Sequence, residues 1–203
     1  GGRVVPGQPG CHGVRGKGEW EVVPDVVEAL DQAFYLAFQT VEPTGKRLVI
    51  ALDVSGSMGD GLIAGVPGLT PRIGSAAMAM VTYKVEKTIA LVAFSAQMTP
   101  VDISRCQRLD DVVRTMDMVR MGATDCALPM LWALKNRVQT DAFVVYTDSE
   151  TWYGKIHPVQ ALREYRERTG IPAKLIVVGM AANEFSIADP TDVGMMDIVG
   201  FDT

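Results

Sequence analysis

Residues 48–58 read Leu-Val-Ile-Ala-Leu-Asp-Val-Ser-Gly-Ser-Met, an apolar run followed by three oxygen-bearing side chains. A continuous aliphatic run is typical of a strand buried on both faces, as in a parallel sheet covered by helices. Asp53, Ser55 and Ser57 follow at alternate positions where the chain turns, so we expect their oxygens to converge. Hard cations such as Mg²⁺ prefer oxygen ligands of this kind. Taken alone, the pattern fits an ordinary strand and polar turn equally well.

Two later stretches favour the metal interpretation. Residues 143–148 form a second apolar run that ends in Asp148, and residues 121–125 form a loop that carries Thr124 just before an expected helix. Together with the first stretch they resemble the von Willebrand factor type A domain and its metal-ion-dependent adhesion site. The matching positions, in the family's order along the chain, are Asp53, Ser55, Ser57, Thr124 and Asp148.

The resemblance implies a role for each of these residues. Ser55 and Ser57 would bind a Mg²⁺ ion (or Mn²⁺ or Ca²⁺) directly, and Thr124 directly or through water. Asp53 and Asp148 would hold metal-bound waters. Because neutral direct ligands leave the charge of the cation poorly compensated, the ion would attract an acidic side chain of a partner protein, or a phosphate. Helices that begin near residues 72 and 127 would add their positive ends.

The remaining chain alternates strands and helices, which predicts an α/β fold. We expect a three-layer von Willebrand A (Rossmann-like) sandwich with a mostly parallel central sheet and helices on both faces. Residues 95–103, which contain Pro100, suit one short antiparallel edge strand, and residues 198–201 suit a last edge strand. The spacing of Val27, Leu30, Phe34 and Phe38 predicts a helix from residue 24 whose apolar face packs on the domain. By the resemblance, the strands ending at Asp53 and Asp148 are central neighbours at a topological switch point, where ligands bind.

Composition sets the boundaries of this interpretation. The chain has 203 residues, a net charge of −5 and three cysteines without CxxC spacing. An odd number of cysteines without metal-binding spacing favours a reducing, cytoplasmic setting over a disulfide framework or a zinc site. No apolar run is long enough for a membrane span, and we expect a monomer. Residues 1–23 are rich in Gly and Pro and are interpreted as an irregular lead-in from an upstream domain, and residues 24–203 as the von Willebrand A domain.

A closer resemblance covers almost the whole chain. It is to the Ro autoantigen family, and it rests on residues 13–17, 40–47, 123–130, 157–158, 161–166, 171–176, 187–190 and 200–203. The resemblance implies a ribonucleoprotein in which an upstream ring of helical repeats binds Y RNAs and misfolded small RNAs. Bacterial relatives of this family exist. The candidates for RNA contact on this chain are Arg15, Lys17, Arg163 and Arg166, although a solvated linker and a helix face with local ion pairs explain the same charges.

Other function classes are weighed against this one. A stand-alone adhesion-type domain would be expected to carry a secretion signal or paired cysteines. A serine hydrolase would need Gly-x-Ser-x-Gly with a histidine partner, which the residues around Ser55 do not supply. His12 and His157 lack the context of a catalytic triad, and His157 before a proline is typical of a helix start. Cys126 is interpreted as a packed thiol, so no enzymatic activity is expected.

Overall fold

The computed structural model describes residues 22–119, 122–148, 154–181 and 187–200. Its centre is a six-stranded sheet in the order β3-β2-β1-β4-β5-β6. All neighbouring strands are parallel except β2 and β3, which are antiparallel. The strands are β1 (Leu48–Asp53), β2 (Ile89–Phe94), β3 (Met98–Pro100), β4 (Ala142–Thr147), β5 (Lys174–Gly179) and β6 (Met195–Val199). The predicted mostly parallel sheet with one short antiparallel strand is therefore confirmed.

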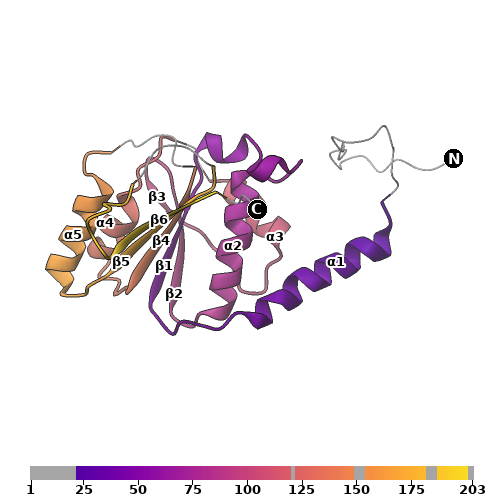
Figure 1. Cartoon of the computed structure of the whole chain (residues 1–203), viewed down its shortest axis with the longest axis horizontal. Helices are drawn as coiled ribbons and strands as arrows, with labels where there is room; N and C mark the ends of the chain where they lie inside the picture. Colours follow the sequence, from indigo (N-terminus) through magenta and orange to yellow (C-terminus); the bar gives the residue numbers. More distant parts are fainter. Residues whose placement is uncertain (1–21, 120–121, 149–153, 182–186, 201–203) are drawn as a thin grey trace.

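Helices cover both faces of the sheet, which gives three layers (Figure 1). On one face lie α2 (Pro71–Val85) and α3 (Leu109–Asp117), and on the other lie α4 (Leu128–Lys135) and α5 (Pro158–Thr169). Prolines occupy the first turns of α2, α4 and α5, where a missing N–H costs no hydrogen bond. Gly170 ends α5 with a φ of 70°, a conformation that glycine adopts without steric cost.

Strand β1 explains why the apolar run at residues 48–52 is continuous rather than alternating. All six of its residues are buried. Val49 and Ala51 face the core shared with α4 and α5, whereas Ile50 and Leu52 face the core shared with α2 and α3. A strand covered on both sides needs apolar residues at every position. This strand belongs to both cores and carries the Asp-x-Ser-x-Ser sequence at its carboxyl end.

Helix α1 (Pro24–Ala37) departs from the sequence-based expectation. It projects from the domain (Figure 1), and none of its residues is buried. Val27 and Leu30 remain 50% and 66% exposed. Only its last turn reaches the core, where Phe34 packs edge-to-face on the buried Phe38 of the following 3₁₀ turn η1 (Phe38–Thr40). The predicted packing of the helix on the domain is therefore wrong for most of its length, because periodicity identifies an apolar face without specifying what covers it.

The last strand also differs from the prediction. The last strand, β6, spans Met195–Val199 and pairs parallel to β5, rather than occupying residues 198–201. Its Asp197 accepts the Ala188 N–H at 3.1 Å, a local contact that apolar patterning does not indicate. In the described part of the chain, no helix has both the length and the apolar character that a membrane crossing requires.

Candidate metal centre

Two of the predicted ligands, Asp53 and Asp148, lie at the carboxyl ends of β1 and β4, the two strands on either side of the topological switch point. From β1 the chain crosses to β2 on one side, and it later returns to β4 on the other. Asp53 is the last residue of β1, and Asp148 follows the last residue of β4 directly. Crevices at this position of open α/β sheets are where ligands bind. The fold therefore brings together side chains that are almost a hundred residues apart in the sequence.

Asp53 joins the two strands through its side chain. Its Oδ1 accepts the backbone N–H of Ser55 at 2.8 Å, which shapes the turn after β1. Its Oδ2 accepts the hydroxyl of Thr147 at 2.7 Å, across the β1–β4 pair. Asp53 is completely buried. The carboxylate is thus fixed in orientation before any ligand arrives.

The two serines lie on the turn that Asp53 shapes. The Oγ atoms of Ser55 and Ser57 are 3.2 Å apart, so both hydroxyls face the same point. Ser55 is buried, and the short 3₁₀ turn η2 (Gly56–Gly59) begins at the next residue. The Asp-x-Ser-x-Ser spacing therefore produces the convergence that it predicted.

The loop that carries Thr124 is fixed against the end of β2, which is the other neighbour of β1. Asp125 N–H donates to the Ser95 carbonyl at 3.0 Å, and Asp125 Oδ1 accepts the Ala127 N–H at 3.0 Å. A Cβ at Gly122 would lie 3.0 Å from the Cβ of Ala96, so glycine permits the close approach of the two loops. Thr124 itself is buried. Its loop consequently lies beside the carboxyl end of β1.

Burial raises the pKa values of two groups at this centre, Asp53 and Cys126. Removal from water raises the pKa of Asp53, and the nearby carboxylate of Asp148 raises it further, against the lowering effect of the hydrogen bonds from Ser55 and Thr147. Cys126 lies close enough to feel the charges of both aspartates, and burial is the main reason that the pKa of its thiol is raised. The thiol stays neutral and packed, as predicted, and is not poised as a nucleophile.

The donor set suits a hard cation. Two buried aspartates of like charge occupy the same strand ends, and hydroxyl oxygens lie beside them. Across the described ranges no three His, Cys, Asp or Glu residues gather around a single point, so a bound ion would depend on serine and threonine oxygens as well. Such a mixture of carboxylate and hydroxyl oxygens matches the preference of Mg²⁺ and does not match that of softer metals.

Comparison with known proteins places this geometry in a family. The family model described as the Ro60 vWA domain matches residues 47–203. The chain belongs to the Ro60 family. A relative named RNA-binding protein RO60 from Deinococcus radiodurans is 50% identical over 190 residues, and one of the same name from Caenorhabditis elegans is 41% identical over 192 residues. Both alignments cover 94% of this chain, which spans only 36% and 30% of the length of the two relatives.

A solved structure agrees with the fold of this Ro60 domain. The crystal structure of the Deinococcus radiodurans RO (RSR) protein superposes with a TM-score of 0.86 at 49% identity. The match covers 95% of this chain and 39% of the solved chain. The three-layer architecture around the strand ends is therefore shared with a Ro protein.

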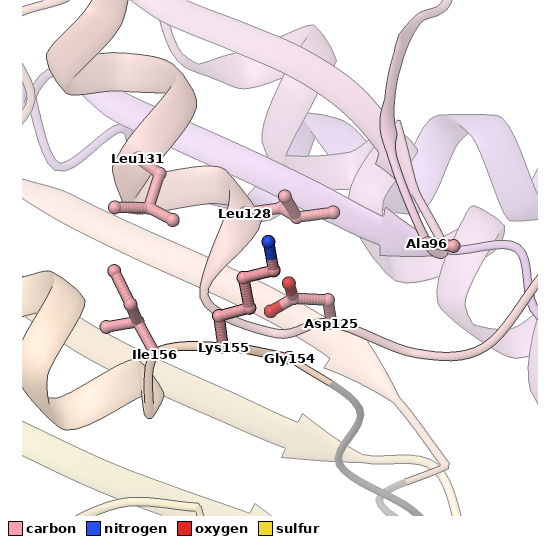
Figure 2. Close-up of a pocket in the computed structure, with 7 residues that line it drawn as sticks. All are labelled: Ala96, Asp125, Leu128, Leu131, Gly154, Lys155 and Ile156. Carbon is pink, nitrogen blue, oxygen red and sulfur yellow. The ribbon is translucent and has the colours of Figure 1, made fainter.

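A cleft lies next to the metal motif of the Ro60 domain. It has a volume of about 620 Å³ and lies between the start of α4 and the segment that leads into α5. Figure 2 shows the side chains of Lys155 and Asp125 reaching into the same space, beside the apolar side chains of Leu128, Leu131 and Ile156. Partial burial raises the pKa of Asp125. The cleft combines an apolar wall with one group of each charge.

The predicted RNA-contact arginines of α5 have partners within the Ro60 domain. Arg163 pairs with Asp189 at 3.1 Å, and Arg166 pairs with Asp192 at 2.5 Å while also donating to the Ala173 carbonyl at 2.7 Å. These contacts fasten α5 to the segment that precedes β6, which supports the interpretation as a face with local ion pairs. Arg15 and Lys17 lie outside the described residues.

Three residues complete the picture of the site. His157 caps α5, its Nδ1 accepting the Val159 N–H at 3.3 Å, as expected of a helix start. Sequence reasoning missed Thr147, although its position directly before Asp148 was a usable signal. It also missed Arg72, a buried arginine that donates to the Ser55 carbonyl at 3.0 Å. Nothing in the sequence pattern distinguishes Arg72 from a solvent-exposed helix residue.

Proposed function

We propose that this chain is a non-enzymatic, metal-dependent ligand-binding domain of a Ro-type RNA-binding protein. The metal would be Mg²⁺, or Mn²⁺ or Ca²⁺, and the residues that would hold it are Asp53, Ser55, Ser57, Thr124 and Asp148. The observation that carries this proposal is the fixed position of the buried Asp53 carboxylate between Ser55 and Thr147. An oriented, buried carboxylate beside a second one is unfavourable by itself and favourable beside a cation.

The chain's own residues would divide the work of binding. Asp53 and Asp148 supply negative charge at the strand ends, while the serine hydroxyls supply neutral oxygens on a preformed turn. When bound, the cation would offer a coordination position to an acidic side chain of a protein ligand. The neighbouring cleft, with the Lys155 ammonium and an apolar wall, could receive the residues that flank such a side chain.

The wider role follows from the relatives. Both relatives described above are named RNA-binding proteins, and we extend this role to the full-length form of the present protein. We propose that the full protein binds Y RNA and misfolded small RNAs and takes part in the quality control of non-coding RNA. We further propose that it is monomeric, cytoplasmic and not attached to membranes.

Calorimetric titration with MgCl₂ and MnCl₂ tests the metal site directly. We expect Asp53→Ala and Asp148→Ala to abolish the binding heat while circular dichroism still reports a folded domain. Asp60→Ala is the matched control, because Asp60 is exposed and follows the same motif. The metal half of the proposal fails if the parent chain gives no binding heat, or if the two variants titrate like the parent.

A further inference from the structure

The lysines and arginines of the domain differ in whether they have acidic partners. Seven arginines form ion pairs. The other described cations have no carboxylate of another described residue within 4.0 Å. They are Lys46, Lys84, Lys87, Arg105, Lys135, Arg137, Lys155 and Lys174. All of these except Lys155 lie on segments at the N-terminal ends of the parallel strands, and we call these seven residues the basic edge.

Backbone hydrogen bonds show that the segments of the basic edge lie side by side. Leu48 N–H donates to the Thr88 carbonyl at 3.0 Å, which joins the entry of β1 to that of β2. Asp141 N–H donates to the Arg47 carbonyl at 2.7 Å, and Lys174 N–H donates to the Asp141 carbonyl at 2.9 Å. These bonds continue the row through β4 to β5. In Figure 1 this is the lower edge of the sheet, where the chain enters β1 from α1.

The row contains three lysines, Lys87, Lys46 and Lys174, at the entries of β2, β1 and β5. Lys174 is the first residue of β5, Lys46 and Lys87 lie two residues before β1 and β2, and all three are exposed. Neighbouring strands are about 4.8 Å apart, so the row from β2 to β5 extends over about 14 Å. Lysine heads on flexible stems along such a row offer point charges to a chain of phosphates.

Two further groups widen the basic edge on either side of the row. Arg105 donates to the Lys84 and Lys87 carbonyls at 3.5 and 3.3 Å, and its guanidinium lies 5.1 Å from the centre of the Tyr83 ring. Lys135 and Arg137 are exposed at the C-terminal end of α4. The positive surface therefore continues onto both helical layers.

The carboxylates closest to the row do not cancel its charge. Arg47 holds Asp141 with a 2.6 Å ion pair, so these two charges neutralise each other. Glu86 is buried and accepts the hydroxyl and N–H of Thr44 at 2.6 Å each, which turns the carboxylate inward. Exposed acidic residues nearby are confined to flanking segments, at Glu42, Asp102 and Glu167.

We propose that the basic edge binds the phosphate backbone of single-stranded RNA, at the end of the sheet opposite the metal centre. This inference rests on the RNA-binding role proposed for the full protein and assigns part of that role to this domain. The contacts are made by lysines and arginines to phosphates, so binding is independent of base sequence and steeply dependent on salt. The net charge of −5 does not oppose it, because the local distribution of charge decides where a polyanion binds.

Helix termini explain only part of the pattern. Lys84 and Lys135 lie in the last turns of α2 and α4, where a cation complements the helix dipole. The helix dipole does not explain the positions of Lys46, Lys87 and Lys174, which are at strand entries. Ion-paired arginines also lie near this edge, at Arg47, Arg166 and Arg168, but a carboxylate matches the charge of each.

The experiment measures fluorescence anisotropy of a labelled single-stranded RNA of about 16 nucleotides with the 203-residue chain, over a salt series in EDTA. A basic-edge triple variant carries Lys46→Gln, Lys87→Gln and Lys174→Gln. A control triple carries Arg108→Gln, Arg114→Gln and Arg163→Gln, which removes the same formal charge from ion-paired positions outside the basic edge. Loss of three phosphate contacts should reduce the salt slope by about 2 and the affinity at 0.1 M salt by about 100-fold. The control triple should bind like the parent.

Several outcomes would overturn the inference. They are equal losses in the two triples, no RNA binding by the parent, and binding of the parent to anionic phospholipid vesicles but not to RNA. Titration with Mg²⁺ on the same samples separates the two proposals. If the parent binds Mg²⁺ but not RNA, the proposal for the basic edge is refuted and the proposal for the metal centre stands. If the parent binds RNA through these lysines but does not bind Mg²⁺, the proposal for the metal centre is refuted and the proposal for the basic edge stands.

Discussion

The guanidinium of Arg72 connects the carbonyl of Ser55 to the carboxylate of Asp117. Its Nη2 donates to the Ser55 oxygen at 3.0 Å, and its Nη1 donates to Asp117 Oδ1 at 2.6 Å. The Arg72 side chain is only 7% exposed, whereas that of Asp117 is 49% exposed. A planar guanidinium can satisfy two acceptors in fixed directions, which an ammonium cannot. Arg72 therefore holds the turn of the metal motif against the end of α3.

We predict that Arg72→Lys weakens Mg²⁺ binding about tenfold, which corresponds to about 1.4 kcal/mol. The substitution also lowers the stability of the domain by about 2 kcal/mol, because a hydrogen bond to a charged group is lost in a buried place. Titration calorimetry and thermal unfolding measure the two effects. Asp117→Asn is the matched variant and should have the smaller effect on affinity, since it leaves the Ser55 contact in place. A reversed order would contradict the positioning role of Arg72.

Asp53 should make the stability of the metal-free domain depend on pH. Its pKa is raised by burial in the folded state. Its stabilising contribution is therefore fully present below the unfolded pKa of about 3.9 and is lost as pH rises through the folded pKa. Asp53→Asn keeps a neutral side chain at every pH. In EDTA the unfolding temperature of this variant should therefore increase relative to that of the parent as pH rises above about 4.

Adding Mg²⁺ should reverse that comparison at neutral pH. A cation at a hundred times its dissociation constant stabilises the parent by about 2.7 kcal/mol and leaves Asp53→Asn unchanged. Thermal melts with and without Mg²⁺ measure this difference. An equal response of both proteins would show that the stabilisation arises elsewhere.

Asp141 should contribute stability with the opposite sign. Hydrogen bonds from the Arg47 side chain and backbone are the main causes that lower the pKa of Asp141 to about 2. Its contribution is present above the unfolded pKa of about 3.9 and is lost as pH falls through the folded value. Asp141→Asn should therefore lower the urea midpoint at neutral pH. The difference from the parent should shrink below about pH 4, and a constant difference into stronger acid would contradict this account.

Tyr165 should matter for stability and not for metal binding. Its buried hydroxyl accepts the Thr140 N–H at 2.9 Å and donates to the Val138 carbonyl at 2.7 Å. Tyr165→Phe leaves both backbone groups unpaired, which costs about 1–3 kcal/mol and lowers the unfolding temperature by about 2–4 °C for each kcal/mol. Tyr83→Phe removes a half-buried hydroxyl and should cost less. The Mg²⁺ affinity should remain that of the parent, because Tyr165 acts at the entry of β4.

The fold could be predicted from the sequence where one physical signal dominated. Strands β1 and β4 are continuous apolar runs with an aspartate at the end of the first and directly after the second. The alternation of strands and helices predicted a parallel sheet, whereas the central places of these two strands were expected from the family resemblance. The positions of Asp53, Ser55 and Ser57 also followed from spacing, because alternate residues on a tight turn share a side. Here local geometry and tertiary structure agree.

The remaining features depend on contacts that local patterns do not encode. The hydrogen bond from Thr147 to Asp53 depends on the register of two strands, and register is set by the packed sheet. Arg72 can be buried because its guanidinium donates to two acceptors, the Ser55 carbonyl and the Asp117 carboxylate. An arginine in a first helical turn is usually solvated. Helix α1 has the periodicity of a packed helix, yet its surroundings leave most of that face exposed.

Strand β1 has six residues, and the two proposed binding regions lie at its two ends. At about 3.3 Å per residue the strand is about 20 Å long, so a ligand at one end does not obstruct a ligand at the other. A protein held at the carboxyl end and an RNA held at the amino end would share one rigid support. Each would then meet the other at a raised effective concentration, and the domain would act as a two-ended adaptor.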